Sequence, residues 1–303
     1  MSALERLPAW ATTGVGSLPF ADPRRAAAHA VAAYDVPFCP QLVALEGDLV
    51  AEWLGGDPRR CAWTPDRDRQ RPLAWDELLD ELAATPPEHG LVKLQVTGPA
   101  TLACALERRG GPAPSARSAA ALAHELSVWL AANAAPWVAT LAECELTTLL
   151  VVDEPGLHVF GTRALEDVWD PLRAIAPAWG LHLCCAVPWE LIVAVAPDVL
   201  SFDLCREPID RRARLALGRL VARGGRVAWG VVAPHRAEHA LHAVKRLRAA
   251  LDVVAVPGEQ SLLTASCGTG RVSARREAEV AAALADTART MRSRRVGSVR
   301  SRA

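Results

Sequence analysis

The sequence predicts a single-domain α/β protein of the (β/α)8 TIM-barrel class. Short β-rich runs alternate along the chain with Ala-, Leu- and Arg-rich helical stretches, and such a series of β-then-α units favours a parallel sheet. Eight β-rich runs are present, which is the number of strands that closes a barrel. The length of 303 residues suits one barrel, and 51% apolar residues are ample for its core.

Each expected element follows from this alternation. The expected strands are Thr12–Ser17, Pro37–Leu42, Val92–Thr97, Thr147–Val152, Leu181–Val187, Val199–Asp203, Arg226–Val232 and Ser261–Ser266. The expected helices include Pro23–Tyr34, Ser118–Glu143, Leu165–Ile175, Arg211–Arg223, Ala237–Leu251 and Ala274–Thr290. We interpret Gly55–His89, which is rich in Pro, Arg and Asp, as a long excursion between the second and third strands. A doubly wound open sheet is the alternative architecture.

The amino-acid composition limits the kinds of molecule and the cellular setting expected for this protein. Lys+Arg and Asp+Glu are balanced at 34 each, so no global charge favours nucleic acid. No long apolar run predicts a membrane span and no signal segment opens the chain, so we expect a soluble, cytoplasmic protein. Eight Cys in such a protein indicate thiols or metal ligands in preference to a disulfide framework. We expect the barrel to span residues 1–288, followed by a basic, disordered tail over 289–303.

Four residues at three expected strand ends form a candidate metal site. His182 and Cys184 lie two apart on the fifth strand, so their side chains point to the same side. Asp203 ends the sixth strand and Cys267 follows the eighth. Each residue alone is more often structural, as a cap, a turn residue or a small core side chain. Together, two thiolates, an imidazole and a carboxylate suit tetrahedral zinc, and catalytic groups of a barrel gather at these strand ends.

Two further groups are expected in the same region. Asp153 and Glu154 end the fourth strand before Pro155, and capping of the next helix would explain them equally well. His235 follows the seventh strand and is a candidate proton donor, whereas His239 and His242 are expected on a helix surface.

The remaining candidate features have an ordinary structural interpretation as well. Glycine-containing turns near the first and third strands, Gly14–Pro19 and Thr97–Ala100, would let a ligand approach the backbone closely, and turn geometry alone explains each about as well. The other thiols show no pairing pattern and are interpreted as structural: Cys39, Cys61, Cys104, Cys144, Cys185 and Cys205.

Taken together, these motifs resemble the C-terminal catalytic barrel of cobalamin-independent methionine synthase, in the superfamily that includes uroporphyrinogen decarboxylase. The resemblance covers Thr13 to about Ala288. A T-x-x-G-S-x-P pattern, a D-E-P-x-L pattern, an H-x-C pair, a strand-end carboxylate and a C-G pair are matched by Thr13, Gly16, Ser17, Pro19, Asp153, Glu154, Pro155, Leu157, His182, Cys184, Asp203, Cys267 and Gly268.

The resemblance implies zinc-dependent transfer of a methyl group from a methylated folate to the thiol of homocysteine, giving methionine. It implies that Asp153 binds the substrate amino group, that Gly16 and Ser17 hold its carboxylate, and that His235 donates a proton. Glu46 is a weaker candidate for a second substrate-binding carboxylate.

Two departures from the family pattern concern the ligand set and the donor. Asp203 stands where the family usually has Glu, and the loop around His235 reads A-P-H-R. Three alternatives stay open: a zinc-thiolate alkyltransferase that uses a corrinoid protein or another alkyl donor, a zinc-binding barrel without catalysis, and, less favoured because its chemistry needs no H-x-C and C-G pair, a decarboxylase.

Overall fold

The computed structural model describes residues 2–54, 71–108, 116–159, 165–236 and 239–299. Its strands are β1 (Ala11–Thr12), β2 (Ser17–Leu18), β3 (Gln41–Leu42), β4 (Leu91–Thr97), β5 (Thr147–Asp153), β6 (Ala178–Leu183), β7 (Val199–Phe202), β8 (Arg226–Val232) and β9 (Ser261–Ala265). Its α-helices are α1 (Pro23–Ala32), α2 (Val43–Glu46), α3 (Leu49–Leu54), α4 (Trp75–Ala84), α5 (Pro99–Arg108), α6 (Ala116–Glu143), α7 (Asp170–Ile175), α8 (Trp189–Val195), α9 (Arg211–Ala222), α10 (Ala240–Val253) and α11 (Ala274–Val299). Short 3-10 helices include Leu4–Arg6, Leu157–Val159 and Gly258–Gln260.

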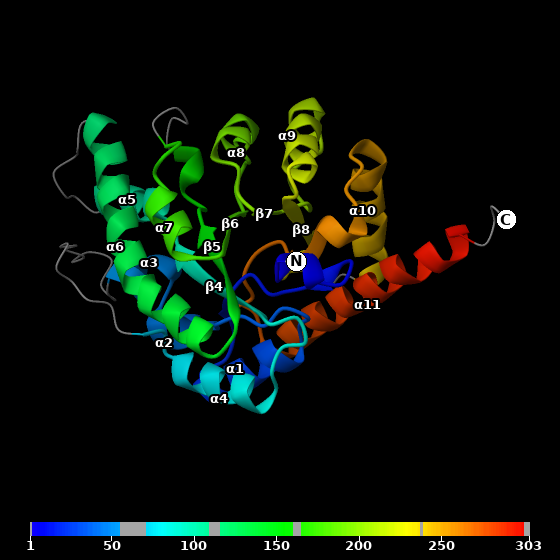
Figure 1. The fold of residues 1–303 in the computed structure, drawn as a ribbon, viewed down its shortest axis with the longest axis horizontal. Coiled ribbons are helices and arrows are strands. Elements are labelled where there is room, and N and C mark those ends of the chain that lie inside the picture. The colour runs from blue at the N-terminus through cyan, green and yellow to red at the C-terminus, as the bar shows by residue number, and fades with distance from the viewer. Residues whose placement is uncertain (1, 55–70, 109–115, 160–164, 237–238, 300–303) are drawn as a thin grey trace.

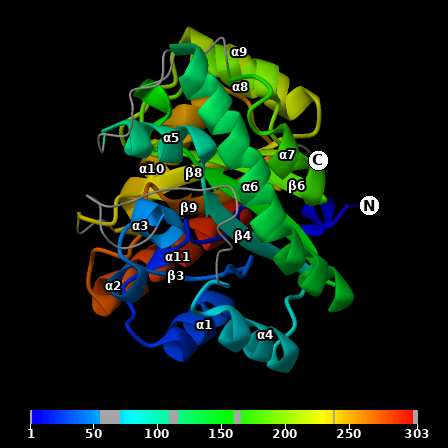
Figure 2. The same ribbon diagram turned by 90° about the vertical axis from the view of Figure 1, so that its left-hand side faces the viewer.

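Seven strands form one curled, parallel sheet in the order β1-β9-β8-β7-β6-β5-β4. Helices α5 to α10 lie around its convex side, whereas α1 and α4 pack together elsewhere on the molecule (Figures 1 and 2). From β4 to β9 each strand pairs with the next one in sequence, and the last strand pairs with the first. This order contains no reversal point, so the doubly wound alternative was wrong.

The second expected strand, Pro37–Leu42, is mostly irregular. Only Phe38 makes an isolated parallel bridge, to Lys93, and Gln41–Leu42 pairs instead with Ser17–Leu18 in a separate two-stranded sheet. Backbone hydrogen bonds nevertheless join this segment to both edges of the main sheet: Val36 N donates to Thr12 O at 2.9 Å, and Lys93 N donates to Pro37 O at 2.8 Å. The segment therefore lies between β1 and β4.

Several other expected elements differ from the observed ones in their bounds or content. The first expected strand, Thr12–Ser17, is divided into β1 and β2, because the glycine-containing turn between them leaves the ladder. Strand β6 begins at Ala178 and ends at Leu183, so Cys184 follows the strand instead of lying within it. The Gly55–His89 excursion contains α4, and its residues 55–70 lie outside the described chain.

The basic tail was expected to lack regular structure, but helix α11 continues to Val299. The Arg292 guanidinium donates to Ala9 O at 2.7 Å and pairs with Asp35 at 3.0 Å, which ties the helix to the first strand region. Residues 300–303 lie outside the described chain, and the domain boundary at 288 stays a prediction.

The core has two layers because side chains alternate across the strands. In β5, Leu149 and Val151 belong to an inner cluster that fills the curled sheet, and Leu150 and Val152 belong to a larger cluster between sheet and helices. Capping residues also mark where helices begin. Asp22, for example, caps α1 by accepting a hydrogen bond from Arg24 N at 3.0 Å.

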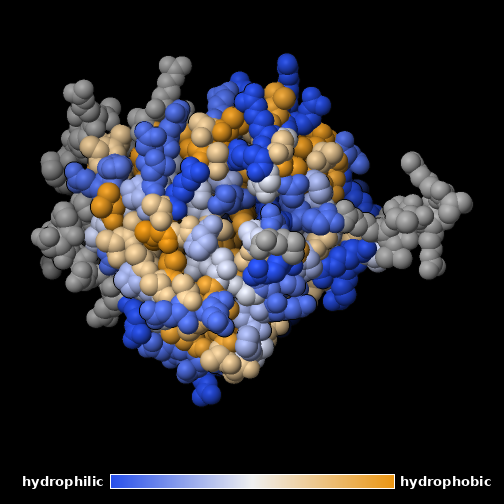
Figure 3. All heavy atoms as spheres, in the orientation of Figure 1, coloured by the Kyte–Doolittle hydropathy of each residue, from blue (hydrophilic) through white to orange (hydrophobic). Residues whose placement is uncertain are grey.

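Hydrophilic residues separate the hydrophobic ones on the surface face seen in Figure 3. Within the described residues, no helix combines the length and the apolar character needed to cross a membrane.

Candidate active site

Polar side chains occupy the concave face of the sheet near the carboxyl ends of its strands. The strand register places Thr97 beside Asp153, Asp153 beside His182, and His182 beside Ser201. Lys93 shares this face because it lies four residues before Thr97 on β4. All five are largely removed from solvent, although barrel interiors are usually filled by branched apolar residues. The apolar filling thus gives way to a polar layer where a barrel's active site is expected.

The two cysteines predicted as metal ligands lie close together. Cys184 follows β6, Cys267 follows β9, and their thiols lie close enough to interact. This interaction lowers the pKa of Cys267 to about 7 and, with burial, raises the pKa of Cys184 well above its usual range. Cys267 is therefore the more easily ionised sulfur. Every cysteine of the described chain is a free thiol, and Cys61 lies outside it.

His182 presents one ring nitrogen that has no protein partner. Its Nδ1 lies 2.8 Å from Ser201 Oγ, whereas its Nε2 is buried without a hydrogen bond. Burial, followed by the charge of Lys93, lowers the pKa of this imidazole to about 3. His182 also lines a cavity of about 20 Å³, enough for a single water molecule. A neutral imidazole whose Nδ1 is fixed and whose Nε2 is open matches the usual state of a metal-ligating histidine.

Asp203 lies near Cys267, but the four predicted ligands are not gathered into one group. It follows β7, is only 6% exposed, and its Oδ1 accepts from Cys205 N at 2.8 Å. Burial raises the pKa of its carboxyl group. Within the described residues, no three His, Cys, Asp or Glu side chains form a group that could hold a metal ion. The side-chain types suit zinc, but the ligands would have to move closer together to hold the ion, and the Asp203 carboxylate would have to leave its backbone partner.

Asp153 and Lys93 form a buried pair of opposite charges. Asp153 Oδ1 is buried without a hydrogen bond. Lys93 Nζ donates to Val15 O at 2.6 Å and to Gln95 Oε1 at 2.9 Å. Burial raises the pKa of Asp153 to about 8 against the opposing charge of Lys93, and burial lowers the pKa of Lys93 to about 8. Sequence reasoning missed Lys93, although a lysine inside an otherwise apolar strand is the signal that could have revealed it.

Glu154, in contrast, is a structural residue. Its carboxylate accepts four hydrogen bonds, from Ala100 N at 3.1 Å, Thr101 N at 2.8 Å, Thr101 Oγ1 at 2.7 Å and Trp169 Nε1 at 3.0 Å. It therefore caps the amino end of α5, the helix that follows the neighbouring strand β4. Any side chain at Gly98 would collide with this carboxylate, so Gly98 makes room for Glu154.

The Gly16–Ser17 turn packs against the loop that carries Cys267. Thr269 N donates to Ser17 O at 3.0 Å, and Gly270 N lies 3.3 Å from Ser17 Oγ. A side chain at Gly16 would collide with Gln95, the partner of Lys93. This turn thus borders both the buried charge pair and the cysteine pair.

Two further predicted residues lie in the segments that follow β8 and β3. His235 is exposed in the loop after β8 and makes no hydrogen bond with any described residue, while Arg276 holds the loop by donating to Pro234 O at 2.9 Å. Glu46 lies in α2, where its carboxylate accepts from Leu42 N at 2.9 Å. Their roles stay predictions.

Comparison with known proteins gives structural neighbours only. No protein-family model and no curated protein matches the sequence. The fold is similar to that of a B12-independent methionine synthase from Shewanella sp. W3-18-1, solved in complex with selenomethionine, with a TM-score of 0.53 and 17% identity over 76% of this chain and 70% of that one. A protein assigned as a vitamin B12-independent methionine synthase from Listeria monocytogenes gives a TM-score of 0.50 and 15% identity over 74% of this chain and 71% of that one.

The chain shares its fold with these methionine synthases. The resemblance inferred from the motifs is thereby confirmed for the fold. At such low identity the comparison establishes architecture, and the chemistry has to be argued from the site.

Proposed function

We propose that this protein is a zinc-dependent S-methyltransferase that transfers a methyl group to the thiol of homocysteine, with a methylated folate as donor and methionine as product. The observation that carries the proposal is the meeting of the Cys184 and Cys267 thiols beside two buried, unpaired polar atoms, His182 Nε2 and Asp153 Oδ1. Buried polar atoms in proteins are nearly always paired, so two unpaired ones in one site indicate groups that a ligand completes.

The zinc ion would be held by His182, Cys184 and Cys267, with Asp203 as the fourth ligand. Zinc favours this mixture of imidazole, thiolate and carboxylate. Ser201 fixes the ring of His182, and the lowered pKa of Cys267 favours its thiolate form. Asp203, whose carboxylate already accepts a hydrogen bond from a backbone N–H, is the ligand we expect an incoming thiol to displace. When bound, zinc would keep the substrate sulfur in its reactive thiolate form at neutral pH.

The protein's own groups would orient the substrate. Asp153 Oδ1 would accept from the ammonium group of homocysteine, and Lys93 supplies the charge that keeps this buried carboxyl ionisable. The Gly16–Ser17 turn, held against the Cys267 loop, would receive the substrate carboxylate, with Glu46 at its border. His235 would donate a proton to the leaving nitrogen of a folate donor.

We also propose that residues 36–39 act as the eighth strand and close the barrel. Their backbone hydrogen bonds to Thr12 and Lys93 support this, since these residues belong to the two edge strands of the curled sheet. Closure would bring the Gly16–Ser17 turn and Lys93 to the same mouth as β6 and β9.

The test is a methyl-donor screen with homocysteine, using protein whose zinc content has been measured. Methionine formed from a methylated folate, lost on chelation and restored by zinc, is the expected result. Methionine formed only with a methylated corrinoid protein would move the function to the alternative alkyltransferase. A protein that binds about one zinc per chain yet alkylates no thiol with any donor would contradict catalysis.

A further inference from the structure

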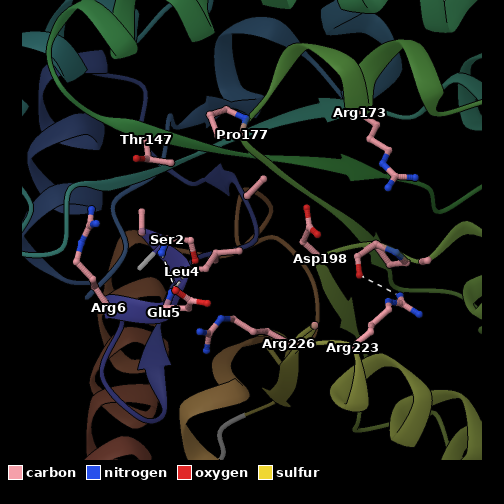
Figure 4. Close-up of a pocket in the computed structure, with 16 residues that line it drawn as sticks. Ser2, Leu4, Glu5, Arg6, Thr147, Arg173, Pro177, Asp198, Arg223 and Arg226 are labelled. Atoms are coloured by element: carbon pink, nitrogen blue, oxygen red, sulfur yellow. Dashed lines mark hydrogen bonds between the residues drawn. The ribbon is translucent and has the colours of Figure 1, made fainter.

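A second cavity lies at the opposite end of the strands from the candidate active site. It has a volume of about 590 Å³, within the usual range for small-ligand pockets. Thr147, Ala178 and Arg226, the first residues of β5, β6 and β8, line it, together with the amino-terminal segment Ser2–Arg6 (Figure 4). Because the active-site candidates follow the carboxyl ends of these strands, this cavity is a separate feature.

Positive charge dominates the lining of this cavity. Four arginines face two carboxylates, which gives a formal net charge of +2 (4 − 2). Both carboxylates already accept backbone hydrogen bonds: Glu5 Oε2 from Ser2 N at 2.7 Å, and Asp198 Oδ2 from Trp179 N at 3.0 Å. The arginines are Arg6, Arg173, Arg223 and Arg226.

Three of the arginines, Arg173, Arg223 and Arg226, make no close ion pair with any described residue. Arg223 donates to Pro197 O at 3.2 Å and Arg226 donates to Glu259 O, both of them backbone carbonyls. Arg173, on α7, makes no hydrogen bond or ion pair with any described residue. Arg173 and Arg223 lie on one side of the cavity, and Arg226 lies with Glu5 on the other, as Figure 4 shows.

The electrostatic environment agrees with this arrangement. Burial lowers the pKa of Arg223, the positive charge of Arg173 lowers it further, and Asp198 only partly opposes both effects. Burial also lowers the pKa of Arg226. Arg173 and Arg223, two cations that repel each other on one side of the cavity, would be stabilised by an anion bound beside them.

We propose that this cavity binds a small oxyanion carrying at least two negative charges, in the form of phosphoryl or carboxylate groups. Guanidinium groups match the geometry of both kinds of oxyanion through paired N–H donors. Arginines on opposite walls favour an elongated ligand with charge at both ends over a single monovalent ion. This site is independent of the proposed methyl transfer, since none of its lining residues belongs to the candidate active site.

The experiment is a calorimetric titration of the full chain with inorganic pyrophosphate and, separately, with citrate at low and matched ionic strength. One saturable site per chain is expected for at least one of the two anions. Preference for pyrophosphate would assign the phosphoryl class, and preference for citrate would assign the carboxylate class. Absence of saturable binding by both anions would overturn the proposal.

Arg173→Gln is the decisive variant, because Arg173 contributes no protein contact that its loss would break. A hydrogen bond to a charged group contributes about 1.5–3 kcal/mol, so affinity should fall about 10-fold to 100-fold. Arg212→Gln is the matched control: it removes the same charge from the far end of α9, where Arg212 lies 4.0 Å from Glu190. Equal weakening in both variants would indicate a general charge effect and would contradict a built site.

Stability separates a binding role from a structural one. Since Arg173 repels Arg223, Arg173→Gln should not lower the Tm of the free protein, yet it should abolish most of the Tm increase caused by the anion. Arg173→Lys keeps the charge without the forked donors and should lose less affinity than Arg173→Gln. A lower Tm of the free Arg173→Gln protein, together with unchanged anion affinity, would overturn the assignment.

Discussion

The neighbouring residues Asp153 and Glu154 belong to two regions that differ in how completely their polar groups are satisfied. The Glu154 region, formed with Ala100, Thr101 and Trp169, contains four hydrogen bonds to one carboxylate. Across the sheet, Asp153 Oδ1 and His182 Nε2 are equally buried and have no partner. Burial alone therefore does not separate structure from function. Completeness of hydrogen bonding is what differs between these two neighbouring carboxylates, and an unpaired buried group costs free energy unless a ligand satisfies it.

We call the region of Asp153, His182, Cys184 and Cys267 the incomplete region, because two of its buried polar atoms have no partner. Removing one of its sulfurs should have the largest effect of all the variants considered. Cys184→Ala should reduce zinc binding by more than about 100-fold, since even the loss of partners behind a metal ligand costs 10–100-fold. Methyl transfer should be lost with the metal. Metal analysis of protein purified under reducing conditions measures the first effect and methionine formation the second.

The adjacent residue offers a matched control for this variant. The Cys185 thiol lies 3.6 Å from Glu154 O and belongs to the Glu154 region, whose carboxylate is fully hydrogen-bonded. Cys185→Ala should therefore keep its zinc and its activity. If both alanine variants retain zinc, the metal is held elsewhere and the ligand assignment is wrong.

His235 tests whether the incomplete region extends into the loop after β8. His235→Asn should slow turnover with a folate donor by on the order of 10²–10⁴, the usual contribution of a positioned general acid. Zinc content should be unchanged, because His235 is not among the four ligands that fill a tetrahedral site. His239→Asn, at the start of α10, is the control and should behave like the wild type. An unchanged rate with folate would remove His235 from the reaction.

A substitution in the Glu154 region should change the stability of the protein and not its chemistry. In Glu154→Gln, the new amide N–H₂ would face backbone and side-chain donors, which leaves at least one buried donor unpaired and should cost about 1–3 kcal/mol. Urea denaturation measures this loss, and Glu166→Gln, at an exposed position, should change nothing. Zinc affinity should be retained. An unchanged midpoint in urea would show that the network contributes little.

The sequence predicted the β-then-α order well because each element carries its own local signal. Strands β4, β5, β8 and β9 lie within one residue of their expected boundaries, since each is a buried apolar run bounded by turn residues. The segment around Phe38 failed because its pairing depends on two distant strands, which local propensity does not encode. Helix α11 extends past its expected end because Arg292 finds partners at Ala9 and Asp35.

The sequence indicates the site residues that belong to motifs at strand ends. It indicates less well the neighbouring residues that set their chemical environment. Cys184 and Cys267 follow their strands and lie close enough to interact, and their role as metal ligands stays a prediction. The partners that set the properties of the site, Lys93 and Ser201, contribute through contacts across the sheet. Lys93 is marked in the sequence only as a lysine within an apolar strand, and no spacing along the chain marks Ser201. The same reason explains why Asp153 and Glu154, adjacent in sequence, could not be told apart in advance.

Asp153→Asn should have the smallest structural effect of these variants, and it tests the contrast between Asp153 and Glu154. Asp153 Oδ1 has no donor to lose, so the substitution should leave the metal-free protein at least as stable as the wild type, unlike Glu154→Gln. The pKa of Asp153 is raised to about 8 from 3.8, so between these values the folded protein holds a proton that the unfolded chain has released. The wild type should therefore lose stability as pH rises from about 4 to about 8, whereas the Asn variant lacks this contribution.

The difference in unfolding free energy between Asp153→Asn and wild type should thus be near zero at pH 4 and grow toward pH 8. Lys93 does not obscure this window, because burial lowers its pKa only to about 8 from 10.5 and its proton exchange falls above that pH. Urea titrations of metal-free protein across this range measure the difference, while homocysteine affinity should fall about tenfold or more, as expected for a lost charge-assisted hydrogen bond. A difference that is constant with pH would show that Asp153 is not strained by burial, and unchanged homocysteine affinity would separate it from substrate binding.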